Sequence, residues 1–585
     1  MMSGAGVGIA GYIDFYGFHS GAGGWFLCGW ATQDWKRRNS SRLSLGFEEG
    51  DQQGFCDAAY FDREDVRGKG DGILIFLQSE PCNLGSLMSI TALTEDDPGL
   101  MLLASNPAHH LRDQELTTCV RSYIDRLPHS PERMRLSGLM SRRGYQGLDT
   151  LGSIASQVRF EIDQSILCSP NGIILCGWCV AQPGAIRTIR LRSGVLSSVI
   201  DLATAIRTER RDVAETIGAE MGVTGQDCGF TVFLPNAIQF DEGETYIEIE
   251  TQSGKTAYRR VEPARMDPMQ ALHRMLGEID LQYAAVAPGF DNVVGPAVGA
   301  LNVARLAHRS CTSVLDFGDV PTTPRVSVIV TLYGRLDFME VQIALASAYT
   351  GNDDVELIYV LDNPSQRREA EGLAESVFAR FGVPFRLIAL ATNLGYGPAN
   401  NVGLQHARGS YICFVNSDVF PGTPNWIERL AEHLEADPQL GVVGPLLLFE
   451  DGSVQHAGIS FQPIARFSDW QFPIHDRKGW RPCVETGLGE RVAITGACLM
   501  MRAADARSIG GFDEDYVIGD FEDVDLCLRM ADAGFKVAID TAVWLYHLER
   551  QSQVSPDQRW RMNLTLYNAW LFQRRWGAHP AVMAH

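Results

Sequence analysis

The sequence predicts an α/β domain with a mostly parallel sheet in the C-terminal half, preceded by two all-β sandwich domains. Two observations support this fold class. From Arg325 onward, strands that are apolar throughout alternate with amphipathic helices, which is typical of a parallel sheet covered on both faces. In the first half, short strands of alternating polarity are separated by Gly, Asn and Asp, and they occur in two related copies.

The two β copies share the same features in the same order. The segment YIDFYGFHSGAGGWFLCGWA from Tyr12 matches FEIDQSILCSPNGIILCGWC from Phe160, and REDV at 63–66 then corresponds to RRDV at 210–213. Alternating strands within about 100 residues favour an antiparallel sandwich. Trp30 and Trp178 end the matching strands, and we expect both to pack in a core, although such a Trp can also stack on a sugar.

Domain boundaries follow from these patterns. We predict β-sandwich repeat 1 at 1–120 and repeat 2 at 155–265, each within the usual size of a domain. A helical pattern in MQALHRMLGEIDLQYAAV predicts a helical linker at 266–323, which ends at Pro321 and Pro324. The α/β domain then covers 324–552, and a helical extension covers 553–585.

Composition limits the classes of function. The formal charge of −21 argues against a protein that coats nucleic acid, so no nucleic-acid partner is expected. Thirteen cysteines without metal-site spacing favour reduced thiols and a cytoplasmic protein. The N-terminus lacks a basic signal-peptide region, and no apolar run reaches the ~18 residues that span a bilayer. Peripheral attachment to the inner membrane and homo-oligomer formation stay open.

Within the α/β domain, helices and strands alternate regularly. Strands are predicted at 325–333, 355–363, 385–390 and 411–418, and helices at 337–349, 365–382, 400–409 and 521–535. Ligands of such sheets bind outside the carboxyl ends of the strands. Polar residues stand at three of these ends, namely Thr331 with Tyr333, Asp362, and Asn416-Ser417-Asp418. One strand that ends in Asp is ordinary turn chemistry, whereas several together favour a site.

These residue types suit a nucleotide and a metal ion. A carboxylate at a strand end can accept hydrogen bonds from a nucleobase or ribose, and carboxylates beside other oxygen donors suit Mg²⁺ or Mn²⁺ with a diphosphate. The turn ATNLGYGPAN adds Asn393 and Asn400, which either line a nucleotide or shape the turn. Further on, Glu522 and Asp523 start a helix inside an acidic segment. They are either a solvated helix start or the position of a general base.

Five ordered motifs resemble a known family: VSVIVTLYGR, YVLDNPS, NLGYGPANNVGLQHARGSYICFVNSDVFP, TGACLMMRAADARSIGGFDEDY and FEDVDLCLR. They resemble the inverting family-two glycosyltransferases with a GT-A fold, in particular the rhamnosyltransferase-like branch. The preceding β copies loosely resemble β-sandwich modules that accompany some bacterial glycan-modifying enzymes. The resemblance implies a nucleotide-diphosphate sugar donor, a glycan or lipid-linked acceptor, and a role in bacterial surface polysaccharide synthesis.

The resemblance also assigns roles to single residues. It implies nucleotide binding by Thr331, Tyr333, Asp362, Asn393, Asn400 and Ser417, and a Mn²⁺ or Mg²⁺ ion held by Asp418, Asn416 and His547. Asp523 matches the catalytic base, with Glu522 beside it. Asn416 departs from the family's more usual aspartate. An alternative function is therefore a catalytically inactive protein that binds or assembles glycans through its β modules.

Overall fold

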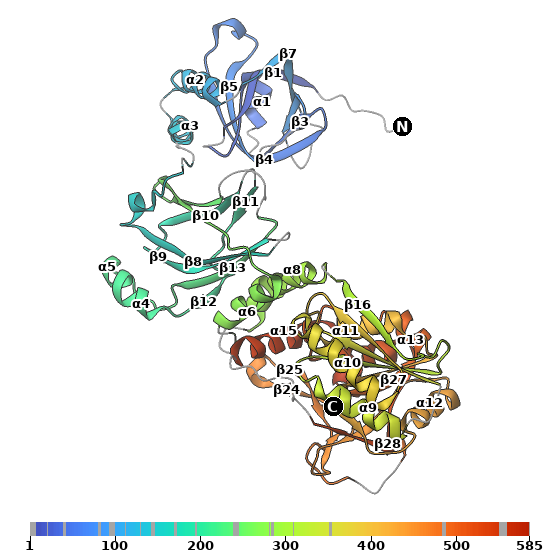
Figure 1. Cartoon of the computed structure of the whole chain (residues 1–585). Helices are drawn as coiled ribbons and strands as arrows, with labels where there is room; N and C mark the ends of the chain where they lie inside the picture. Colours follow the sequence, from blue (N-terminus) through green and yellow to red (C-terminus); the bar gives the residue numbers. More distant parts are fainter. Residues whose placement is uncertain are drawn as a thin grey trace.

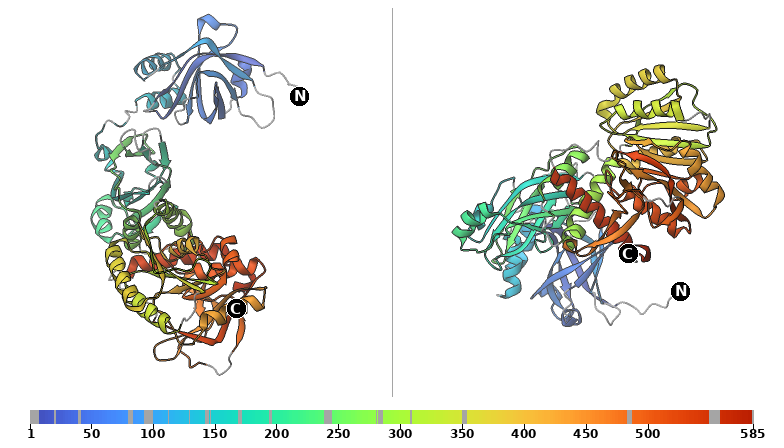
Figure 2. Two further views of the ribbon diagram at one scale, coloured as in Figure 1. Left: turned by 45° about the vertical axis from the view of Figure 1, so that its right-hand side comes forward. Right: turned by 90° about the horizontal axis from the view of Figure 1, so that it is seen from below.

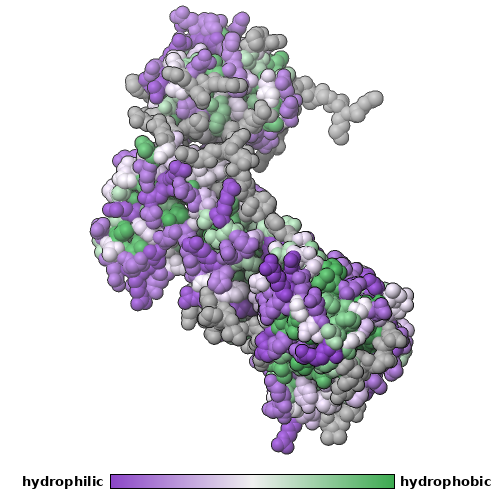
Figure 3. Space-filling model, in the orientation of Figure 1, coloured by the Kyte–Doolittle hydropathy of each residue, from purple (hydrophilic) through white to green (hydrophobic). Residues whose placement is uncertain are grey.

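The computed structural model describes residues 8–19, 22–38, 42–79, 84–92, 100–111, 113–128, 130–141, 145, 147–168, 172–193, 196–237, 245–279, 281, 286–307, 309–349, 354–482, 487–548 and 558–583. Two β modules precede a larger α/β domain along the chain (Figure 1). In Figure 3, hydrophilic residues dominate the visible face of the second β module, whereas hydrophobic and hydrophilic residues are mixed over the α/β domain. Among the described residues, no helix is both long and apolar enough to cross a membrane.

The first β module is a closed barrel with the strand order β1-β2-β5-β4-β3-β6-β7. Its strands are β1 (Ile9–His19), β2 (Gly24–Ala31), β3 (Arg42–Phe47), β4 (Gly50–Phe61), β5 (Asp71–Gln78), β6 (Leu87–Ala92) and β7 (Met101–His110), with α1 (Gln33–Arg38) and η1 (Glu64–Val66) between them. Helices α2 (Asp113–Ile124) and α3 (Pro131–Ser141) follow and pack on the outside of the barrel. The predicted boundary at residue 120 was therefore wrong, because it falls inside α2.

The second β module consists of two four-stranded sheets, β11-β10-β14-β15 and β12-β13-β9-β8, which enclose one core. Its strands are β8 (Val158–Cys168), β9 (Gly172–Ala181), β10 (Ile186–Ser193), β11 (Leu196–Val199), β12 (Ile206–Thr208), β13 (Gly229–Pro235), β14 (Thr245–Thr251) and β15 (Thr256–Arg260). The short helices are η2 (Leu151–Ile154), α4 (Arg211–Val213), η3 (Ala214–Gly218) and α5 (Ala219–Met221). A polar cleft of about 280 Å³ lies along residues 161–166 and 259–264, between β8 and β15.

The prediction of a sandwich was wrong for the first module, and a single strand explains why. In the first module, β4 is continuous over twelve residues and pairs with both β3 and β5, so it joins the two halves. In the second module the corresponding stretch is split into β11 and β12 by a turn in which Asp201 accepts the Ala203 N–H. On the other side, β1 pairs with β7 along its length, whereas β8 meets the end of the module at the Ile166–Ala264 bridge.

The shared sequence features fold into the same arrangement in both modules. The Asp of each Ile-Asp pair sits at a β-bulge, where the register shifts around Asp14 and around Asp163. The Arg of REDV and RRDV bonds this Asp and a second Asp two residues further on. Opposite the bulge stands the Gly of Cys-Gly-Trp. A Cβ on Gly29 or Gly177 would lie 1.9 or 2.0 Å from a carbonyl oxygen of the neighbouring strand.

The two tryptophans of the repeat differ in their surroundings. Trp178 packs against a small cluster with Val180, Val213 and Cys228, beneath the helical turn of residues 211–221. Trp30 is half-buried and contacts the ring of Tyr12, 5.9 Å away between ring centroids. Both tryptophans are half-buried, and of the two only Trp178 packs against a buried cluster.

The segment predicted as a linker is part of the folded structure. It contains α6 (Pro268–Glu278), α7 (Val286–Gly289), η4 (Phe290–Val294), α8 (Gly295–Leu306) and β16 (Cys311–Phe317). Strand β16 pairs with β19 as an edge strand of the large sheet, so the α/β domain begins before the predicted residue 324. Figures 1 and 2 show α6 and α8 beside the C-terminal helix α15, between the second β module and the large sheet.

The α/β domain contains an eleven-stranded sheet, ordered β16-β19-β18-β17-β20-β27-β22-β28-β21 with β23 and β26 attached. Its strands are β17 (Val326–Leu332), β18 (Val355–Leu361), β19 (Phe385–Leu390), β20 (Tyr411–Asn416), β21 (Val419–Pro421), β22 (Leu440–Leu448), β23 (Val454–His456), β26 (Leu488–Arg491), β27 (Cys498–Arg502) and β28 (Lys536–His547); β24 (Ile459–Ile464) and β25 (Trp470–His475) form a separate hairpin. Strands β19-β18-β17-β20 are mutually parallel, as is the β22–β28 pair. The other strand pairs described for this sheet are antiparallel, so "mostly parallel" was correct for the central strands and wrong for the rest.

Helices cover both faces of this sheet. One face is covered by α9 (Asp337–Tyr349), η5 (Pro364–Gln366), α10 (Arg367–Phe381) and α12 (Trp426–Ala436). The other is covered by α11 (Tyr396–His406), α13 (Ala503–Ser508), α14 (Glu522–Asp532) and α15 (Gln558–Trp576), with η6 (Ala465–Phe467) and α16 (Pro580–Met583) nearby. The alternation of helix and strand predicted from residue 325 is confirmed, except that α11 starts four residues before the predicted Asn400.

Candidate active site

The carboxyl ends of β17, β18 and β20 lie side by side because these strands are parallel neighbours. Thr331 in β17 is the register partner of Asn416 at the end of β20. The Asp362 N–H donates to the Leu332 carbonyl oxygen over 2.9 Å, which joins the ends of β18 and β17. The sheet therefore brings the three predicted polar endings to one edge.

Asp418 and His547 form the centre of one side of the site. They lie next to paired strands, since Val419 of β21 is the register partner of His547. His547 Nε2 is 3.4 Å from Asp418 Oδ1, and each residue is only 6% exposed. His547 Nδ1 is buried and has no hydrogen-bond partner among the described residues. Carboxylate and imidazole are a donor pair that divalent ions accept.

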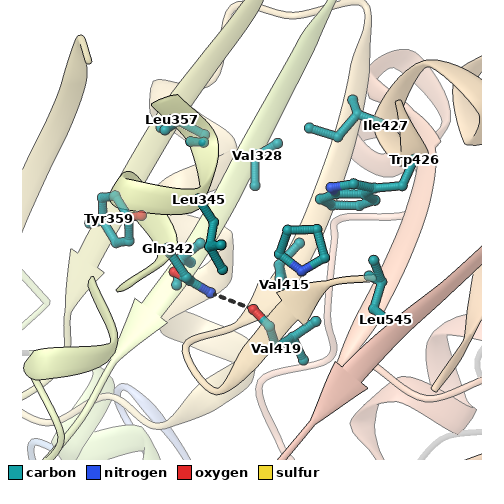
Figure 4. A pocket seen from close by; sticks show the side chains of 13 residues that line it. Val328, Gln342, Leu345, Leu357, Tyr359, Val415, Val419, Trp426, Ile427 and Leu545 are labelled. Atoms are coloured by element: carbon teal, nitrogen blue, oxygen red, sulfur yellow. Dashed lines mark hydrogen bonds between the residues drawn. The ribbon is translucent and has the colours of Figure 1, made fainter. Parts of the chain in front are cut away.

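The backbone of this turn is held from both sides. The Gln342 side-chain amide donates to the carbonyl oxygens of Asn416 and Val419, each over 3.0 Å. Figure 4 shows this amide pointing from α9 across a small apolar cavity of about 60 Å³. From the other side, the Leu548 N–H donates to the Asp418 carbonyl oxygen. The cavity is far smaller than a typical ligand pocket, so we interpret it as space behind the turn.

Asp523 defines the other side of the site. It is half-buried in the first turn of α14, and its Oδ2 accepts the Gly496 N–H over 2.8 Å. Its Oδ1 accepts the Val524 N–H. The next residue after Gly496, Ala497, accepts the Asn416 N–H through its carbonyl oxygen over 2.9 Å. The segment 495–497 therefore connects the end of β20 directly to Asp523.

Burial perturbs the two carboxyls at the start of α14. Burial raises the pKa of Glu522 well above its usual range, and the neighbouring Asp523 and Asp520 add to this. Glu522 Oε2 has no hydrogen-bond partner among the described residues. Burial also raises the pKa of Asp523, but its backbone donors favour the ionised form. Of the two, Asp523 is thus better stabilised as a carboxylate, which suits it to accept a proton.

The chain approaches Asp523 through a strained segment. Ile518, Asp520 and Phe521 all have positive φ angles, of 66°, 91° and 76°. Such conformations in residues other than Gly persist only when the surroundings impose them. Asn568 of α15 is fully buried and bonds the N–H and carbonyl of Val517 and the carbonyl of Gly519. The helix α15 thus holds the segment that places Asp523.

Asp362 lies on the nucleotide side predicted from the sequence, but its carboxylate is buried. Its Oδ1 accepts the Leu394 N–H over 2.6 Å, and its Oδ2 accepts the Gly395 N–H over 2.8 Å. Burial raises the pKa of Asp362 to about 7, although these two bonds and the charge of Arg305 oppose the rise. The carboxylate therefore orders the loop that follows β19.

The other predicted nucleotide residues occupy the same edge in different ways. Asn393 Oδ1 accepts the Gly395 N–H, and Asn400 is completely buried, with Nδ2 bonded to the Tyr396 carbonyl oxygen. Thr331 Oγ1 is buried without a hydrogen-bond partner among the described residues, whereas Tyr333 is 44% exposed. Ser417 is buried beside Asp418. Asn393 and Asn400 thus shape the turn through local bonds.

Several residues that connect these parts of the site were not predicted from the sequence. Tyr396 donates its hydroxyl to the Gly496 carbonyl oxygen over 2.6 Å and so links the loop after β19 to the Asp523 side. His456 Nε2 accepts the Thr495 N–H, and its Nδ1 lies 3.0 Å from His475 Nδ1. Burial, with His475 and His547 nearby, lowers the pKa of His456 well below its usual range. A single His in a strand carries no recognisable sequence pattern, so only the fold reveals that His456 contacts Thr495 and His475.

Residues 327–482 match the family model described as Glycosyl transferase family 2. This segment is a family 2 glycosyltransferase domain. The match includes every predicted nucleotide-binding residue and the Asn416–Asp418 turn. Asp523 and His547 follow the matched segment in sequence, yet α14 covers the same sheet and His547 ends β28 in it.

The chain is also similar to named proteins and to solved structures. The O-antigen biosynthesis protein RfbC of Myxococcus xanthus is 29% identical over 262 residues, which is 43% of this chain and 19% of that protein. The N-acetylglucosaminyl-diphospho-decaprenol L-rhamnosyltransferase of Mycobacterium tuberculosis is 28% identical over 222 residues, 35% of this chain and 70% of that protein. The structure of GalNAc-T7 with UDP, GalNAc and Mn²⁺ is 15% identical and has a TM-score of 0.32 over 45% of this chain and 52% of that chain. The chain thus spans about a fifth of the length of RfbC.

Proposed function

We propose that this chain is an inverting glycosyltransferase of the GT-A type. It transfers a sugar from a nucleotide-diphosphate sugar to a glycan or lipid-linked acceptor in the synthesis of a bacterial surface polysaccharide. The observation that carries this proposal is the arrangement around segment 495–497, which fixes Asp523 on one side and the Asn416–Asp418 turn on the other. The similarity to an O-antigen protein and to a rhamnosyltransferase supports the class of acceptor.

A divalent ion, Mn²⁺ or Mg²⁺, fits the Asp418 side. Within the described residues, no three His, Cys, Asp or Glu side chains are grouped so that they could hold a metal ion. Asp418 and His547, whose Nδ1 has no hydrogen-bond partner among the described residues, would supply two ligands, with the Asn416 amide oxygen a third candidate and the donor diphosphate the rest. Such an ion offsets the charge that grows on the leaving diphosphate.

Residues of the chain itself bind the nucleoside and accept the proton of the acceptor. The loop held by Asp362 receives the nucleoside, close to Thr331 and the exposed Tyr333. Asp523, as general base, takes the proton of the acceptor hydroxyl at one of its two carboxylate oxygens. The acceptor oxygen then attacks the anomeric carbon from the face opposite the diphosphate, which inverts the configuration. Burial raises the pKa of Glu522 and favours its neutral form, which lowers the negative charge beside this base.

Release of nucleoside diphosphate tests the proposal. The full chain is incubated with UDP-, GDP- and dTDP-linked sugars, with Mn²⁺ or with a chelator, and with lipid-linked sugar acceptors. We expect one donor to release its nucleoside diphosphate in a metal-dependent way, and NMR of the product to show an inverted anomeric centre. Binding of glycans without release from any donor would instead favour the inactive, glycan-binding alternative. A retained anomeric configuration would contradict the role of Asp523.

A further inference from the structure

Helix α8 precedes the family 2 domain in sequence but reaches its nucleotide loop. Asn302 and Arg305 of this helix are buried, at 2% and 3% exposure. The Arg305 guanidinium donates through Nη1 to the Asn393 carbonyl oxygen over 3.1 Å. Through Nε and Nη2 it donates to Asn302 Oδ1, over 3.2 and 2.6 Å. Asn302 thus fixes the fork of the guanidinium, which in turn holds the start of the loop.

The loop is therefore held from two elements at once. Asp362 at the end of β18 accepts the N–H groups of Leu394 and Gly395, and Arg305 donates to the carbonyl oxygen of Asn393, the residue before them. Opposite charges on the two buried side chains favour the ionised form of each. Asp362 alone would bind only N–H groups of this backbone segment, and Arg305 alone would bind only a carbonyl oxygen. The two side chains together therefore fix the segment.

The same helix also contacts a second segment of the α/β domain, at Glu514. Asn302 Nδ2 donates to the Glu514 carbonyl oxygen over 2.8 Å. The Glu514 side chain accepts from Asn401 of α11 and pairs with Arg309 just after α8. Buried residues of α8 and α6 share one hydrophobic cluster with strands of the second β module and of the large sheet. Helix α8 thus connects the β module to the nucleotide loop.

We propose that Arg305, seated by Asn302, is a positioning residue that holds the loop 393–395 in the form that binds the nucleoside diphosphate of the donor. This inference rests on the proposed function. It means that the nucleotide site of the family 2 domain is completed by a helix outside the domain. Helix α8 then belongs to the catalytic unit because it carries part of the donor site, and its hydrophobic cluster joins the second β module to that unit.

The electrostatics give the proposal a pH signature. The charged groups around the pair are Arg305 and Arg309 at α8, Glu514 beside them, and Asp362. Only the ionised carboxylate of Asp362 accepts both loop N–H groups without a competing proton, so binding of the nucleotide weakens as the pH falls through its pKa. Loss of the Arg305 charge raises that pKa further. The acidic limit of nucleotide binding then moves to higher pH.

The experiment measures binding of UDP, GDP and dTDP, each with Mn²⁺, by calorimetry across pH on the full chain. Arg305→Met should raise the Kd of the nucleotide that the wild type binds by about tenfold or more, since a buried hydrogen bond from a charged donor is lost. In the same variant, the pH below which nucleotide binding weakens should be higher than in the wild type. Arg305→Lys keeps the charge without the fork, so it should weaken binding less and leave the acidic limit in place. Arg274→Met on the exposed side of α6 is the matched control and should bind as the wild type does.

Two outcomes would overturn the inference. One is wild-type affinity together with an unchanged acidic limit in Arg305→Met. The other, decisive if Arg305→Met does not fold, is wild-type affinity in Arg305→Lys. Hydrogen exchange of the Leu394 and Gly395 amides separates this inference from the proposed function. Faster exchange in a folded Arg305 variant supports the positioning role even if no nucleotide binds, whereas unchanged exchange contradicts it.

Discussion

Charged side chains cluster in the β modules and at the active site, but in opposite settings. In the β modules, Arg63 and Arg210 each bind two aspartates at the surface, and Asp65 and Asp212 keep 61% and 65% of their side-chain surface exposed. At the active site, Asp362 and Asp523 accept backbone N–H groups and lie in largely buried positions. Exposed charges that neutralise each other fix a bulge, whereas buried carboxylates held by backbone donors remain able to take part in chemistry.

The largest effect is expected at Asp523. Asp523→Asn keeps the size and one of the two acceptor oxygens but removes the proton-accepting charge. We expect turnover to fall by about 10²–10⁴-fold, the usual contribution of a general base, while donor binding and thermal unfolding change little. Steady-state rates and nucleotide calorimetry check this. Near-normal turnover would place the base elsewhere.

The same residue gives a pH prediction. Burial raises the pKa of Asp523, and the base must be ionised to act, so the rate should fall as the pH drops through this raised pKa. The acidic limb of kcat/KM should therefore lie above the ordinary value of about 3.9 for aspartate. A rate that stays constant down to pH 4 would contradict the assignment.

Asp418 should show the next largest effect. Asp418→Asn leaves a weaker ligand beside His547, so the Mn²⁺ concentration for half-maximal activity should rise by about tenfold or more. A chelator should abolish wild-type activity, and added Mn²⁺ should restore it. The surface carboxylate Asp212 offers a matched control, because Asp212→Asn should leave the metal requirement unchanged.

Glycine substitutions probe the bulge that the two β modules share. Alanine at position 177 would place Cβ 2.0 Å from the Glu161 carbonyl oxygen, so Gly177→Ala should destabilise the second module by about 1–3 kcal/mol or more. Gly29→Ala should act in the same way on the first module. Gly152→Ala meets no atom within 4 Å and serves as the control. Denaturant unfolding checks all three, and equal midpoints for Gly177→Ala and Gly152→Ala would refute the packing argument.

The smallest effects are expected at the surface arginines. Arg63→Met should cost about 1 kcal/mol, and Arg210→Met less, because Arg63 is 19% exposed and Arg210 is 30% exposed. Turnover should be unchanged in both. Unfolding at low and high salt distinguishes a charge effect, which salt screens, from a packing effect. A larger loss of unfolding free energy for Arg210→Met than for Arg63→Met would contradict this comparison of the two modules.

Much of the α/β domain could be predicted from sequence because its signals are local. Apolar strands and amphipathic helices alternate within windows of about ten residues, and polar residues follow the strands directly. Asp525 and Arg529 stand four residues apart, the spacing of ion pairs on one helix face, and Arg529 Nε lies 2.7 Å from Asp525 Oδ2. The folds of the β modules were harder to predict from the sequence. Closure of the first module into a barrel depends on whether the single strand β4 stays continuous and pairs with both β3 and β5.

The sequence by itself determined the central strands, the helices between them, the residues at their ends and the twofold repeat of the β module. Only the tertiary structure decided which partners those residues meet. Arg305 lies 88 positions before Asn393, and Asn568 lies 51 positions after Val517, yet each fixes a loop of the site. The reason is physical. Periodicity reports which face of an element is apolar, whereas a hydrogen bond between distant segments depends on how whole elements pack.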